Sequence, residues 1–187
     1  MDDVIVTYDN GYETRTYPDG SWERVKTNQK RGLMEYENST GFWQSTYFNK
    51  NGSIVSKINS NGINRQWEYE NINGVDYTVY YSDENGIEKY FDYDNKGNMI
   101  FSERDLWMDD SYNFDNTEVT FYAYNDLNLP IAILYMKERV LEIREYDKYG
   151  KLVHNTFLSS KDGYDLDGLE ELFPYSNIGD LISELYK

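Results

Sequence analysis

Apolar and polar residues alternate along most of the chain, and the alternation restarts after each of a series of short polar turns. In residues 75–81, VDYTVYY, every second position is Val or Tyr. In residues 87–93, IEKYFDY, the residues Ile87, Phe91 and Tyr93 fall on the side opposite Glu88. A period of two, carried by β-branched and aromatic residues, predicts β-strands.

The turns between these strands share one pattern: an apolar or aromatic residue, Asp or Asn, two tolerant positions and Gly. It occurs as FNKNG at 48–52, INSNG at 58–62, YDNKG at 93–97 and YDKYG at 146–150. Asp or Asn accepts backbone hydrogen bonds and Gly adopts positive φ, which predicts a type I turn closed by a glycine bulge. In YNDLN, 124–128, Asn takes the place of Gly, as the next best residue for left-handed backbone.

The spacing of the turns predicts the topology. The turn glycines are Gly20, Gly41, Gly52, Gly62, Gly74, Gly86 and Gly97. After a first step of 21 residues they recur every 10–12, and TNQKRG at 27–32 is interpreted as an altered turn within that first step. We therefore expect a mainly β fold, an antiparallel β-meander of roughly a dozen strands from Val4 to about Leu158.

The motif Tyr-Asp-x-x-Gly followed by an apolar residue, in YDNKGNMI and YDKYGKLV, resembles the YD (Rhs-type) repeats. The spacing of Asn-Gly turns and aromatics is also similar to the MORN-variant repeats of bacterial proteins. The resemblance covers about four-fifths of the chain and implies β-hairpins joined into an extended or curled sheet. Because such repeats serve as shells, surface modules and binding scaffolds, it implies no particular function.

The end of the chain has a different period. Residues 166–173 have apolar positions at helical spacing before Pro174, and Ile178, Leu181, Ile182 and Leu185 fall at i, i+3, i+4 and i+7. This pattern predicts a repeated-hairpin region at 1–160 and a short helical cap at 161–187 packed on it as one domain. The helix is expected to cover an open end of the sheet, or alternatively to bind a partner.

The net charge of −16 is unevenly distributed. Residues 25–66 carry +4, residues 67–104 carry −6, and residues 105–126 carry −6 without a single Lys or Arg. An acidic surface improves solubility, but a stretch of one sign also attracts basic partners. Direct binding to nucleic acid or to anionic membranes is disfavoured.

Sites for common enzyme chemistry are not predicted. The chain has no Cys, and its single histidine, His154, lies in a strand-like stretch, so thiolate zinc sites and Cys/His nucleophile pairs are excluded. The stretch DGYDLDGLEE fails the calcium-loop pattern, because Gly163 and Pro174 stand where carboxylates are needed. We expect a protein without cofactor or metal that is not an enzyme. The acidic start and the lack of a long apolar run predict a cytoplasmic location.

The segment from Arg104 to Glu118 has no turn glycine and breaks the rhythm of the strands. One interpretation is a long connection whose aromatics pack on the sheet; the other is a partner-binding loop with apolar anchors among carboxylates. The predicted partner-binding residues are Trp107, Asp109, Asp110, Tyr112, Phe114 and Asp115.

These features predict a small acidic protein that binds and inhibits a basic, nucleic-acid-handling partner, such as a nuclease or a nucleoprotein complex. A phage-encoded inhibitor of the anti-CRISPR kind and an immunity protein against a toxin fit equally. The alternative is a repeat module that binds carbohydrate or a cell surface through a row of exposed aromatics. Candidates for that row are Trp43, Trp67, Tyr80 and Tyr90.

Overall fold

A computed structural model describes residues 3–106, 117–138, 140–159 and 173. It shows a mainly β protein with one sheet of 14 strands, which lie in the sheet in the same order as in the chain. The predicted antiparallel β-meander is therefore confirmed. The chain divides into two compact units, Met1–Tyr69 with Tyr80–Gly86, and Glu70–Val79 with Ile87–Lys187.

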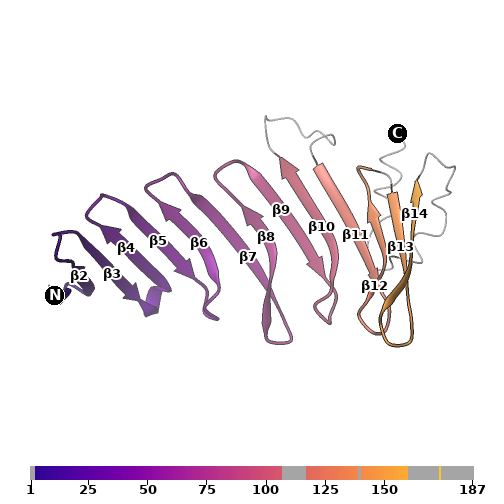
Figure 1. Ribbon diagram of the computed structural model, residues 1–187, viewed down its shortest axis with the longest axis horizontal. Coiled ribbons are helices and arrows are strands. Elements are labelled where there is room, and N and C mark those ends of the chain that lie inside the picture. The colour runs from indigo at the N-terminus through magenta and orange to yellow at the C-terminus, as the bar shows by residue number, and fades with distance from the viewer. Residues whose placement is uncertain (1–2, 107–116, 139, 160–172, 174–187) are drawn as a thin grey trace. The chain divides into compact units, whose positions relative to one another are not determined.

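The N-terminal unit contains the first six strands and parts of the next two. These strands are β1 (Ile5–Asp9), β2 (Tyr12–Thr16), β3 (Trp22–Asn28), β4 (Leu33–Asn38), β5 (Trp43–Phe48), β6 (Ile54–Asn59), β7 (Asn64–Ile72) and β8 (Val75–Ser82). Figure 1 shows β3 to β6 side by side as successive antiparallel arrows. Each strand from β1 to β7 pairs with the next one along the chain.

The C-terminal unit holds the remaining strands. These strands are β9 (Ile87–Tyr93), β10 (Met99–Leu106), β11 (Thr117–Tyr124), β12 (Pro130–Tyr135), β13 (Val140–Tyr146) and β14 (Leu152–Ser159). They also pair in chain order, as Figure 1 shows for β9 to β11.

The repeated turns form as their sequence predicts. At Asp94 the side chain accepts hydrogen bonds from the backbone N–H groups of Lys96 and Asn98, and Gly97 closes the turn with φ of 85°. Asn128, at the position of a missing glycine, also has positive φ, 58°. The Asx side chain holds the turn in place while the last residue supplies the left-handed backbone that a bulged hairpin needs.

Some turns differ from the repeat, among them the two-residue turn at Asn73–Gly74, whose φ values are 54° and 87°. The segment TNQKRG contains the single turn of 3-10 helix η1 (Gln29–Arg31), which ends at Gly32 with φ of 55°, so it is a turn, as interpreted from the spacing. The first hairpin turns at Asn10 and Gly11, whose φ values are 50° and 82°. This two-residue type I′ turn is absent from the predicted set, although Asn-Gly is the strongest short hairpin signal.

The two units bury different amounts of side chain. A row of apolar residues crosses five strands of the C-terminal unit in direct register: Phe101, Phe121, Leu134, Leu141 and Leu158. Phe121 and Leu141 are each only 1% exposed and form the centre of its core. Within the described part of the N-terminal unit, the buried side chains are those of Thr46 and Asn59.

The predicted helices of the C-terminal segment lie outside the described residues. Phe173 is described: it is 3% exposed and belongs to the core cluster, with its ring centroid 6.4 Å from that of Phe121. An aromatic residue from this part of the chain therefore contributes to the core of the C-terminal unit.

Candidate functional site

The six predicted partner-binding residues lie outside the described residues. They are Trp107, Asp109, Asp110, Tyr112, Phe114 and Asp115. The structure does change the limits of the segment that breaks the rhythm. Arg104 and Asp105 belong to β10 and pair with Glu118 and Thr117 of β11. The ends of the predicted loop are therefore regular strand.

Strands β9 and β10 place three carboxylates around one tyrosine on a single face. Tyr90 lies directly opposite Glu103, and Glu88 and Asp92 lie two residues away from Tyr90 on the same side of β9. The Tyr90 hydroxyl donates a hydrogen bond of 2.9 Å to Glu88. We call Glu88, Tyr90, Asp92 and Glu103 the acidic patch. Tyr90 is 38% exposed and Asp92 is also exposed, so the patch is accessible from solvent.

The other face of the same two strands carries the cations. Lys89 lies directly opposite Arg104, and Arg104 approaches Glu118 of β11 at 3.5 Å. Because side chains alternate between the two faces of a strand, EKYFD in β9 and ERD in β10 separate the charges. On β9 and β10 as described, the patch side carries acidic residues without Lys or Arg.

Glu103 connects the patch to a buried carboxylate. Partial burial, and secondarily the negative charge of Asp105, raise the pKa of Glu103. Asp105 lies two residues further along the same face, is 9% exposed, and accepts a hydrogen bond of 2.6 Å from Thr117. A positively charged group beside Glu103 would oppose these two effects and favour its charged form.

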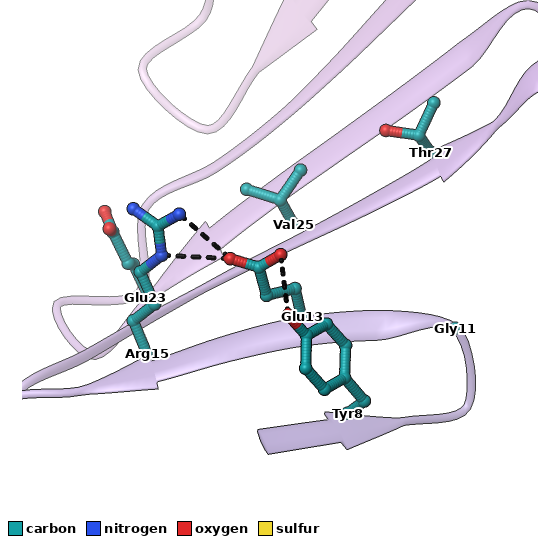
Figure 2. A pocket seen from close by; sticks show the side chains of 7 residues that line it. All are labelled: Tyr8, Gly11, Glu13, Arg15, Glu23, Val25 and Thr27. Atoms are coloured by element: carbon teal, nitrogen blue, oxygen red, sulfur yellow. Dashed lines mark hydrogen bonds and ion pairs between the residues drawn. The ribbon is translucent and has the colours of Figure 1, made fainter. Parts of the chain in front are cut away.

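A concave region lies in the N-terminal unit, on strands β1 to β3. It has a volume of about 450 Å³ and is lined by Tyr8, Gly11, Glu13, Arg15, Glu23, Val25 and Thr27. Figure 2 shows Glu13 between Tyr8 and Arg15. Its carboxylate accepts hydrogen bonds from Arg15 Nε at 3.0 Å and from the Tyr8 hydroxyl at 3.4 Å.

The two carboxylates of this concavity are arranged as hydrogen-bond acceptors. The Glu23 carboxylate accepts hydrogen bonds from the hydroxyl groups of Tyr17, at 2.7 Å, and Tyr36, at 3.2 Å. The hydrogen bond to Glu23 raises the pKa of Tyr17, and the bond to Glu13 raises the pKa of Arg15. The concavity is thus lined by carboxylates that accept hydrogen bonds from neighbouring Tyr and Arg side chains.

The aromatic residues of the N-terminal unit do not form one row. Trp43 is 44% exposed and shares a face with Tyr47, which is 38% exposed. The register through β5, β6 and β7 places Trp67 on the opposite face, where its ring lies 5.6 Å from that of Tyr81. A single stacking surface that includes both Trp43 and Trp67 is therefore not formed.

Within the described parts of the chain, no group of three His, Asp or Glu side chains has the geometry to hold a metal ion. His154 is exposed on β14, opposite Glu145. Among the same residues, no helix has the length and apolar character that crossing a membrane requires.

Comparisons with known proteins do not assign the chain to a family. No protein-family model matches it, and a search of curated proteins finds no significant match. The likeness to YD and MORN-variant repeats remains a resemblance of turn motifs and strand spacing.

The acidic patch was not identified as a site from the sequence, although it lies within the acidic stretch 67–104. The alternation of IEKYFDY places Glu88 and Asp92 on one face. The register shift between Met99 and Phe101 then decides which face of β10 joins them. A bulge of this kind moves every later side chain to the other face, so Glu103 could be assigned to the patch only with the register known.

Proposed function

We propose that this protein is a non-enzymatic binding protein that uses the acidic patch to hold a basic protein partner. The observation that carries the proposal is the separation of charge across β9 and β10, with acids around Tyr90 on one face and Lys89 with Arg104 on the other. Such a face attracts cations and orients the encounter, while an exposed tyrosine supplies a rigid contact.

The proposed partner handles nucleic acid, and the proposed effect is inhibition. A protein surface that binds phosphates is lined with Lys and Arg, which a patch of carboxylates complements. The charge of the chain agrees with this assignment: residues 70–187 contain 25 acidic and 10 basic residues, a net charge of −15. Both a defence-nuclease inhibitor of the anti-CRISPR kind and a toxin immunity protein belong to this class. Neither needs a cofactor.

The test is capture of host proteins by the immobilised chain and by matched charge variants. The patch variant carries Glu88→Gln and Asp92→Asn. The control variant carries Asp126→Asn and Glu138→Gln, two exposed residues outside the patch, so both lose the same amount of charge. We expect the patch variant to bind the captured basic protein at least about tenfold more weakly, and the control to bind normally.

Binding experiments with the captured protein then distinguish a steric block of its nucleic-acid site from a lock of its conformation. If the chain competes with nucleic acid for that protein, occupation of its phosphate-binding surface is supported. If the partner keeps its nucleic acid in the complex, it is held in an inactive conformation. Equal binding by the patch and control variants would reject the acidic patch. A Trp107→Ala variant tests the separate expectation that residues 107–116 contribute, with a loss of about 2 kcal/mol or more in binding.

A second candidate function concerns the N-terminal unit. Trp43 and Tyr47 are both exposed and stand four residues apart on one face of β5, so both rings can contact one sugar chain. We propose carbohydrate binding here as the alternative. Binding to a glycan array that is lost in Trp43→Ala and kept in the patch variant would support it.

A further inference from the structure

Among the strands that the structure describes, β1 is an edge of the sheet, and it carries few of the features that normally protect an edge. It stands at the end of the strand order, and all five of its residues are exposed, with Ile5 at 62% and Tyr8 at 75%. It contains no Lys, Pro or bulge, and its register with β2 is unbroken. Natural edge strands usually carry at least one of these features, because an open edge pairs readily with another strand.

The first hairpin determines which backbone groups of β1 face outward. Asp9 and Tyr12 close the two-residue turn at Asn10–Gly11 and form its hydrogen-bonded pair. Hydrogen-bonded and non-hydrogen-bonded pairs alternate, so Thr7 and Ile5 also bond to β2. The N–H and C=O groups of Val6 and Tyr8 consequently point away from the sheet.

We propose that β1 pairs with β1 of a second copy of this chain, antiparallel and centred on Thr7. A two-fold axis perpendicular to the sheet places Thr7 opposite its own copy and Val6 opposite Tyr8. The outward groups of Val6 and Tyr8 then complete hydrogen-bonded pairs in both directions. Thr–Thr pairs and aromatic–β-branched pairs are among the favourable cross-strand neighbours.

Charge selects this register and this edge. Centring on Val6 instead would place Asp9 opposite Asp3 of the other copy twice, and like charges directly opposite are destabilising. Residues 1–69 contain nine acidic and eight basic residues, a net charge of −1, against −15 for the rest of the chain. The opposite edge, β14, lies in the strongly acidic part and has a register shift between Glu145 and Tyr146.

The pairing also brings together the concave regions of the two copies. An axis perpendicular to the sheet keeps both copies of Tyr8 and Glu13 on the same face, so the regions shown in Figure 2 meet across the axis. A five-residue strand forms a small interface, and small interfaces give weak complexes. We expect an equilibrium between monomer and dimer that is visible between micromolar and near-millimolar concentration.

The test is sedimentation of the full chain as a function of concentration and salt. Because both copies are acidic, screening should strengthen self-association, whereas it should weaken the partner binding proposed above. Val6→Pro removes the outward N–H of Val6 in both copies and should weaken the dimer about tenfold or more. Val6→Thr, which keeps that N–H and a β-branched side chain, serves as the control and should leave the dimer intact.

A charge swap at the axis tests the register. It also keeps the proposal testable in the event that the Val6→Pro variant does not fold. Thr7→Glu and Thr7→Lys should each weaken self-association, because identical charges then meet at the axis. An equal mixture of the two variants should restore it as a mixed dimer. A wild-type chain that stays monomeric at every concentration and salt would overturn the proposal. So would association that survives Val6→Pro, or a mixture that fails to recover.

Discussion

Thr117 Oγ1 donates a hydrogen bond of 2.6 Å to Asp105 Oδ1, and the two residues lie directly opposite each other on β11 and β10. Both side chains are buried, at 6% and 9% exposure. A buried carboxylate without a donor is costly, so loss of this bond should destabilise the end of β10.

Thr117→Val should lower the free energy of unfolding by about 1–3 kcal/mol, because it preserves shape while removing the donor to Asp105. Urea unfolding at neutral pH measures the change. Thr120→Val is the control: it makes the same substitution at a half-buried position on the other face of β11, where we expect less than about 1 kcal/mol. Equal losses in the two variants would mean that the hydrogen bond to Asp105 contributes little.

Glu103→Gln should make the protein more stable at neutral pH. Burial, and then the charge of Asp105, raise the pKa of Glu103, so the folded state binds this proton more tightly than the unfolded chain does. The resulting stabilisation is present at acid pH and is lost as the pH rises through the raised pKa. Melting temperatures should therefore favour the variant at pH 7 and converge with wild type in acid. A variant that is less stable at pH 7 would contradict this assignment.

Glu84→Gln should have the opposite sign. Arg65 donates two hydrogen bonds to Glu84, of 3.2 and 3.1 Å. These bonds lower the pKa of Glu84 to about 2. Stabilisation from a lowered pKa is present above the ordinary value for Glu and disappears as the pH falls through the folded value. The variant should melt below wild type at pH 7, and the gap should close as the pH falls towards about 2. A gap that is independent of pH would rule out this carboxylate as its source.

Gly97→Ala should destabilise the fold more than Gly52→Ala, although both glycines have strongly positive φ, 85° and 89°. Each alanine meets the cost of left-handed backbone, about 1–2 kcal/mol. At Gly97 the added methyl group would also collide with the ring of Tyr77, whereas at Gly52 it would enter open space. Thermal melting of the two variants measures the difference. Equal losses would mean that the Tyr77 ring moves aside freely.

The sequence predicts this fold well because the decisive information is local. The turn at Asp94 depends on that side chain and on Gly97, and both lie within four consecutive positions of the chain. The acidic patch is harder to predict because it depends on pairing between strands. The bulge after Met99 determines that Glu103 lies on the same face as Tyr90. Alternation within one strand carries no information about that shift.

Buried polar residues are equally hidden in the sequence. Glu142 looks like an ordinary outward residue of VLEIREY, yet it is 4% exposed and accepts hydrogen bonds from Tyr135, Arg144 and Asn155. Burial opposes its charge, but these donors outweigh that effect and lower the pKa of Glu142. The partners come from three different strands, so only the assembled sheet brings them together.

The agreement between chain order and strand order has a consequence for how such a protein can evolve. Because the strands that the structure describes pair in chain order, duplicating or deleting one hairpin leaves every other pairing among them intact. An even number of strands also preserves the direction of every later strand. The surface offered to a partner can therefore lengthen or shorten in hairpin steps without a new fold being required.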